Sequence, residues 1–371
     1  MDKYDPQPRT YQGTENIMLG RIFRDLPADV RFSIVGIYVI LAIANIGVWV
    51  CAWIAFHAYP VLLGTALLAY GFGLRHAVDA DHIAAIDNVV RKLMQEGKRP
   101  VAVGFFFSLG HSTVVVLMAL VVALTAGALQ SRLQAFKDFG DIVGTLISAF
   151  FLLLVAIMNI FIMIGTWKTF RRVSRGGLYD EEDMDMIIAR GGPLAHLFRP
   201  VFKLIRKSWH MYPLGLLFGL GFDTATEVAL LAISATEASK GLPIWSVLVF
   251  PALFTAGMSL VDTTDGILML GAYGWAFLNP LRKLFYNITV TAVSVVVALL
   301  VGGIETLGLI GDKFGLAGRF WGFIGSLNDN FGDLGYLIIG IFAVCWGCSL
   351  VLYRAKGYDK IAVTTSTPAA N

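Results

Sequence analysis

Long apolar stretches are the feature that most limits what this 371-residue chain can fold into. A helix needs about 20 mostly apolar residues to cross the hydrocarbon core of a bilayer. Only 15% of the residues are charged, against about 25% in soluble domains. Eight stretches reach the required length: residues 32–56, 61–90, 101–126, 141–165, 212–236, 245–273, 284–306 and 333–353. We therefore predict an all-α, polytopic membrane protein with eight transmembrane helices.

The connections between these stretches differ strongly in positive charge. The N-terminal tail, every second connection and the C-terminal tail together hold 23 lysines and arginines, whereas the other connections hold five. Because positively charged connections stay in the cytosol, we expect both termini there. The predicted parts are a cytosolic N-terminal tail (1–31), transmembrane helices 1–4 (32–165), a cytosolic loop (166–211), transmembrane helices 5–8 (212–353) and a cytosolic C-terminal tail (354–371).

The second apolar stretch contains a dense polar cluster. Its members are Arg75, His76, Asp79, Asp81 and His82. Ionisable side chains cost several kcal/mol in lipid and are kept there when something binds them. Imidazole nitrogens combined with carboxylate oxygens suit a divalent transition metal such as Ni, Co, Zn, Mn or Fe. We therefore predict that this segment belongs to a metal path.

Helical geometry limits how this cluster could bind one ion. On a regular helix, His76, Asp79 and His82 form a stripe about 120° wide, but the two histidines lie roughly 9 Å apart along the axis. Asp81 falls off that stripe. The four side chains cannot all bind one ion from a regular helix. Either the helix is broken here, or some of these groups orient a histidine through its other ring nitrogen.

Other predicted spans carry further candidate metal-binding residues. Carboxylates one helical turn apart share a face and would repel each other unless a cation or proton lay between them. An alternative for each pair is a buried polar network that links helices, and for a lone histidine it is a hydrogen-bonded packing role. The candidates are Asn45 in the first stretch, His111 in the third, Asp223 with Glu227 in the fifth, and Asp262 with Asp265 in the sixth.

Two short matches indicate an internal repeat. Residues 107–112 resemble residues 254–259, and Gly71-x-Gly73 in the second stretch resembles Gly219-x-Gly221 in the fifth. Both matches are three helices apart, and an odd offset reverses the direction through the membrane. We therefore expect an inverted repeat around a midplane site. The same glycines are places where helices bend or pack closely.

Four motifs resemble those of one family, the nickel/cobalt transporters, which are eight-helix secondary permeases. They are residues 75–83, 107–115, 220–227 and 253–265, in the family's order. The resemblance implies a permease of the bacterial cytoplasmic (inner) membrane that takes up Ni²⁺ and also admits Co²⁺, as substrates rather than cofactors. In that family the first motif's histidines and second aspartate are central, which here are His76, His82 and Asp81. Selectivity is associated with Val78 and Asn45, a pair that resembles the nickel-selective type.

Two rival classes share part of this chemistry. A metal efflux transporter would use similar ligands but would more often carry a histidine-rich loop, and an intramembrane metalloprotease would carry His-Glu-x-x-His. The chain has neither feature. It also has no phosphate-binding Gly-Lys-Ser/Thr loop. We therefore expect no enzyme activity, no ATPase subunit and no nucleic acid, and expect Ni²⁺ and the lipid bilayer as the partners.

Overall fold

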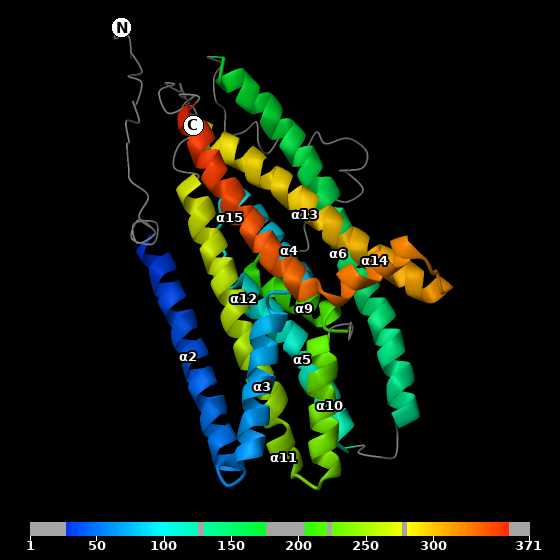
Figure 1. The fold of residues 1–371 in the computed structure, drawn as a ribbon. Coiled ribbons are helices and arrows are strands. Elements are labelled where there is room, and N and C mark those ends of the chain that lie inside the picture. The colour runs from blue at the N-terminus through cyan, green and yellow to red at the C-terminus, as the bar shows by residue number, and fades with distance from the viewer. Residues whose placement is uncertain (1–26, 125–129, 176–204, 221–224, 277–279, 356–371) are drawn as a thin grey trace.

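The computed structural model describes residues 27–124, 130–175, 205–220, 225–276 and 280–355. Within these ranges there is no strand, and the regular elements are helices (Figure 1). The predicted all-α class is thereby confirmed. Most of both predicted tails and of the predicted loop 166–211 lies outside the described residues, as does Asp223.

The helices overlap the predicted apolar stretches in chain order. They are α2 (Ala28–Phe56), α3 (Pro60–His76), α4 (Ala80–Gln95), α5 (Val103–Leu124), α6 (Gln130–Val173), the short η1 (Ser208–His210), α9 (Met211–Phe218), α10 (Ala225–Ser239), α11 (Ile244–Val247), α12 (Val249–Ala276), α13 (Pro280–Phe314), α14 (Arg319–Asp329) and α15 (Phe331–Ala355). Among the described residues, five helices are long and apolar enough to cross a membrane, or up to seven spans if each of two bent pairs is one span. The fifth predicted span corresponds to α9 and α10, which are separated by undescribed residues.

One of the bent pairs is the stretch that carries the polar cluster. Helix α3 ends at His76, α4 begins at Ala80, and the two axes differ by 51°. Asp79 has extended backbone angles, φ −62° and ψ 148°, at the position that precedes α4. Aspartate favours this N-cap position, where the backbone is not yet helical. The second predicted span is therefore broken, which was one of the two alternatives that helical geometry left open.

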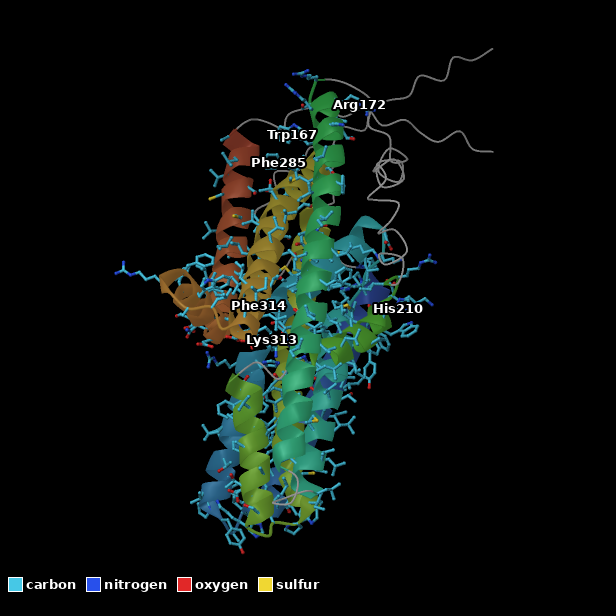
Figure 2. The ribbon with its side chains drawn as sticks, turned by 90° about the vertical axis from the view of Figure 1, so that its right-hand side faces the viewer. Trp167, Arg172, His210, Phe285, Lys313 and Phe314 are labelled. Carbon is cyan, nitrogen blue, oxygen red and sulfur yellow. The ribbon has the colours of Figure 1, made fainter. Side chains whose placement is uncertain are left out.

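Helix α12 lies inside the bundle and contacts α2, α3, α4 and α5 (Figure 1). Helix α5 also packs along α9, and α6 along α13. Phe285 lies near the upper end of the α6–α13 pair in Figure 2. Its ring is 5.9 Å from that of Phe170 in α6. The last turn of α6, with Arg171 and Arg172, lies at that same end.

Glycines let the helices around the polar cluster approach backbone to backbone. A Cβ atom at Gly73 of α3 would overlap the backbone of Phe254 in α12, and one at Gly104 of α5 would overlap the backbone of Asp262. Gly219 is similarly close to the backbone of His111. The predicted close packing at Gly73 and Gly219 is therefore present, whereas a Cβ at Gly71 would meet nothing within 4 Å. Gly221 lies outside the described residues.

Replacing Gly73 with alanine is expected to destabilise the protein, because the added methyl group meets main-chain atoms that cannot rotate away. The expected loss is about 1–3 kcal/mol, measured as a lower midpoint of thermal unfolding in detergent. Gly71→Ala is the matched control in the same helix, and it should leave the midpoint unchanged or raise it. Equal midpoints for the two variants would contradict the close approach of α3 and α12.

Candidate metal site

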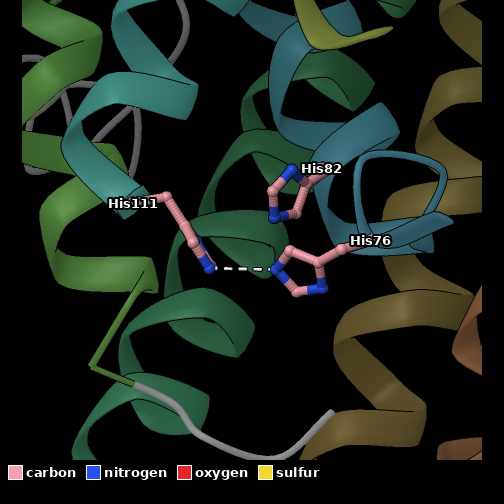
Figure 3. Close-up of side chains that lie close together, drawn as sticks. All are labelled: His76, His82 and His111. Atoms are coloured by element: carbon pink, nitrogen blue, oxygen red, sulfur yellow. Dashed lines mark hydrogen bonds between the residues drawn. The ribbon is translucent and has the colours of Figure 1, made fainter. Parts of the chain in front are cut away.

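Three histidines from three helices converge where the second predicted span is broken. His76 ends α3, His82 lies in the first turn of α4, and His111 comes from α5. All three are buried, with exposures of 2% or less. Figure 3 shows their rings facing one another, with centroid separations of 4.7–4.9 Å. The chain thus brings residues of two separate motifs into one cluster.

The spacing of the ring nitrogens fits a single ion. One nitrogen from each histidine can be chosen so that all three lie within 4.8 Å of one another. Two nitrogens bound at about 2.1 Å to one ion lie roughly 3–4 Å apart, depending on the angle between them. The Nε2 atoms of His76 and His111 lie 2.9 Å apart. Small side-chain movements would bring this cluster to coordination distance.

Three carboxylates hold the histidine rings in place. Asp79 accepts a hydrogen bond from Nδ1 of His76 at 2.9 Å, and Asp262 of α12 accepts one from Nδ1 of His82 at 3.2 Å. Glu227 of α10 accepts one from Nε2 of His111 at 2.9 Å. Because a carboxylate accepts hydrogen bonds, the first two bonds put the proton on Nδ1 and leave the Nε2 lone pair for a metal. These contacts fix the orientation and the tautomer of the His76 and His82 rings.

Glu227 is placed differently from the other two carboxylates. Its Oε1 atom lies 2.9 Å from Nε2 of His111 and 3.9 Å from Nε2 of His76, so it faces the space between two rings. It is fully buried. Within the described part of the chain, Nδ1 of His111 and Nε2 of His82 have no hydrogen-bond partner. The cluster therefore combines a buried carboxylate with unpaired ring nitrogens.

The remaining predicted site residues lie around this cluster rather than in it. Asp81 is partly exposed in the first turn of α4, and Asp265 lies one turn along α12 from Asp262. Asn45 of α2 bonds to the hydroxyl of Tyr70 and to two backbone carbonyls. Val78 is buried in the break between α3 and α4. The fifth of these residues, Asp223, lies outside the described residues.

Asp87, Asn88 and Arg91 of α4 were not predicted as functional residues. They are nonetheless buried, with exposures of 0%, 2% and 1%. Two of them fall inside the predicted second span and Arg91 directly follows it. Charged and amide side chains within an apolar stretch are the signal that could have identified them from sequence.

The apolar helices and the buried cluster define a class: a multi-pass membrane protein with a histidine and carboxylate cluster in its interior. Residues 62–352 match the family model NicO, described as high-affinity nickel-transport protein. The chain therefore belongs to the NicO nickel-transport family, which confirms the predicted family. The matched proteins are transporters rather than enzymes, as was also predicted.

Individual relatives support the same family. The chain is 62% identical over 333 residues to the high-affinity nickel transport protein of Cupriavidus necator, covering 90% of this chain and 95% of the relative. It is 47% identical to the nickel transporter NixA of Staphylococcus aureus (81% and 88% covered) and 40% identical to the cobalt transport protein NhlF of Rhodococcus rhodochrous (87% and 92% covered). No solved structure matches the chain.

Proposed function

We propose that this protein is a high-affinity secondary permease that takes up Ni²⁺ across the bacterial cytoplasmic membrane. The observation that carries the proposal is the cluster of His76, His82 and His111, buried at a broken membrane helix in a chain of the nickel-transport family. A buried cluster of neutral nitrogen donors and carboxylates replaces the water that the ion loses. A broken helix at the midplane is typical of secondary transporters.

Within the site, the contacts of each side chain distinguish the proposed metal ligands from the groups that orient them. His76 and His82 bind the ion through Nε2, since their Nδ1 atoms face Asp79 and Asp262. His111 and Glu227 complete the set from α5 and α10. Asp81, Asp223 and Asp265 line the path and lower the electrostatic barrier for a cation. Asn45 supports the site from α2 through its bond to the Ala256 carbonyl of α12.

The membrane arrangement that suits this function has eight spans and an inverted repeat. Spans 2 and 5 carry equivalent glycine motifs, and a described helix ends within each span, α3 at His76 and α9 at Phe218. Gly73 brings α3 against α12, and Gly219 brings α9 against α5. The distribution of positive charge supports cytosolic termini.

The driving force requires no ATPase subunit. An inside-negative membrane potential contributes about 2.3 kcal/mol per elementary charge per 100 mV, and a divalent ion carries two such charges. That energy favours accumulation once the site alternates between the two sides. A single chain that binds the ion and rearranges around it is sufficient.

Accumulation of radioactive nickel tests this function directly. Cells that express the chain should accumulate ⁶³Ni²⁺ from submicromolar solution faster than cells that carry an empty vector. Accumulation below the control would support the rival efflux transporter and contradict uptake. Collapse of the membrane potential with an uncoupler should slow the uptake, because the potential drives a divalent cation inward.

Replacing Val78 with phenylalanine is expected to raise cobalt uptake relative to nickel uptake by about tenfold, a typical effect of reshaping a binding pocket. Val78 is buried in the break directly between His76 and Asp79, so a larger side chain alters the spacing of the ligands. Competition between ⁵⁷Co²⁺ and ⁶³Ni²⁺ measures the ratio. Val50→Phe, at a position 51% exposed on α2, is the control and should leave the ratio unchanged. A ratio for Val78→Phe equal to that of the control would exclude Val78 from selectivity.

A further inference from the structure

A second buried polar cluster lies along α4 beyond the histidines, and the proposed site does not use it. At its centre is Asp87, five residues from His82 and fully buried. Its carboxylate accepts a hydrogen bond from the hydroxyl of Ser294 in α13 at 2.7 Å and another from the hydroxyl of Tyr273 in α12. One side chain of α4 is therefore bonded to two other helices.

The neighbouring residues extend this network to a fourth helix. Asn159 of α6 donates its amide to Oδ1 of Asn88 at 2.7 Å. Nη2 of Arg91 donates to the same oxygen at 2.5 Å and lies 3.9 Å from the carboxylate of Asp87. All of these side chains are buried. Helices α4, α6, α12 and α13 are thus joined by polar contacts through one region of the bundle.

This network lies on one side of the metal site. Asp87 is about 7.5 Å further along the helix axis than His82, toward the connection 91–100. That connection carries four of the lysines and arginines that predict a cytosolic position. The buried residues around Asp87 therefore stand between the histidine cluster and the predicted cytosolic side.

The composition of the network suits a contact that is made and broken. A buried ion pair is weak evidence for stability, because desolvation costs offset the attraction, and its best-attested use is in registry and switching. Within the described residues, Nε and Nη1 of Arg91 have no hydrogen-bond partner. A network selected only for stability would satisfy those donors. The hydroxyl donors from α12 and α13 are uncharged, so their separation from Asp87 leaves no unpaired charge on either of those helices.

We propose that Asp87 is an interhelical latch: its bonds to Tyr273 and Ser294 hold α12 and α13 against α4 and close the path on the cytosolic side. The latch must open in each cycle for the ion to leave the histidine cluster. This inference rests on the proposed function as a transporter. It assigns Asp87 a role in conformational change rather than in metal binding.

Cysteine accessibility tests the latch. In a chain with Cys51, Cys345 and Cys348 replaced by serine, Val90→Cys places a thiol at a fully buried position three residues beyond Asp87. Removing one hydrogen bond to a carboxylate, by Ser294→Ala or Tyr273→Phe, shifts the opening equilibrium about 10- to 100-fold. A membrane-impermeant maleimide applied to the cytosolic face of inverted vesicles should label the thiol faster by that factor. The KM for external Ni²⁺ should rise in the same variants.

Matched variants separate the latch from a loss of packing. Ser294→Thr keeps the hydroxyl and should retain the parent labelling rate. Thr289→Val removes a hydroxyl of α13 that bonds to its own helix, to the carbonyl of Phe285, and should also label at the parent rate. The latch would be overturned if Ser294→Ala and Tyr273→Phe were labelled no faster than Thr289→Val. Fast labelling of Ser294→Thr would also overturn it. Uptake of ⁶³Ni²⁺ by the parent chain is scored separately, so failure of the transport function is recognised independently of the labelling result.

Discussion

Replacing His76 with alanine is expected to reduce the initial rate of nickel uptake at submicromolar nickel by at least about 100-fold, more than the loss of an orienting group would cause. His76 lies 2.9 Å from His111 and 3.9 Å from Glu227, and its ring centroid lies 4.7 Å from that of His82. Its loss removes a ligand and leaves Asp79 without its hydrogen-bond donor. The measurement is ⁶³Ni²⁺ uptake normalised to the amount of protein in the membrane.

The control for this prediction is another histidine of the same chain. His57 is exposed at the end of α2, where Nδ1 bonds to the carbonyl of Trp53. His57→Ala should transport nickel at the normal rate. A second readout, calorimetric titration of the purified protein with Ni²⁺, should show that His76→Ala no longer binds the ion with high affinity. Normal uptake by His76→Ala would remove the histidine cluster as the transport site.

The helical fold was predictable from sequence because membrane helices depend on local composition. Runs of about 20 apolar residues have few alternatives in lipid, and within the described residues a helix overlaps each predicted stretch. Helical angles also showed that His76, Asp79, Asp81 and His82 could not all bind one ion from a regular helix. The structure resolves that conflict with the break at residues 77–79. Sequence periodicity gave a broken helix as one of two alternatives, but it contained no information on the 51° angle between α3 and α4, both of which pack against α12.

The pairing of each histidine with a particular carboxylate was less predictable from sequence. Asp79 lies close in sequence to His76, and helix geometry already placed both on one stripe. The pairing of His82 with Asp262 joins residues 180 positions apart. That contact depends on the distance between α5, α12 and α4, which small residues such as Gly104 set through backbone contact. Local patterns contain no information on such distances, so ligands and orienting groups could not be separated from sequence.

The two polar clusters of α4 have different physical tasks. The histidine cluster holds neutral nitrogen donors beside carboxylates, a composition that favours a divalent cation. The carboxylate of Asp87 faces the guanidinium of Arg91 and accepts hydrogen bonds from two hydroxyl groups, so it attracts a cation less strongly than an unpaired carboxylate would. Under the proposed function, the ion binds at the first cluster, and under the proposed latch it passes the second only when the helices there separate. A single helix carries both a ligand and a closing contact, which couples binding to movement.

Replacing Asp262 with asparagine is expected to weaken Ni²⁺ binding by about 10- to 100-fold, the usual effect of losing a group that orients a metal-binding histidine. Asp262 is fully buried and lies 3.2 Å from Nδ1 of His82. Asparagine keeps the shape but not the charge. If its amide nitrogen faces the ring, Nδ1 becomes the acceptor, and the proton moves to Nε2 and blocks the lone pair that would bind the ion. Calorimetric titration in detergent measures the affinity.

Asp265→Asn distinguishes an orienting role from a general effect of charge. Asp265 lies on the same helix one turn away, and within the described residues its Oδ2 atom has no hydrogen-bond partner. Asp265 therefore does not orient a histidine ring. Asp265→Asn should bind Ni²⁺ with an affinity within about threefold of the parent. It should transport Ni²⁺ more slowly, because only the electrostatic barrier along the path has changed. Equal losses of affinity in both variants would show that Asp262 acts through its charge alone. A loss confined to Asp262→Asn would establish that the ring of His82 must be held in one tautomer for nickel to bind.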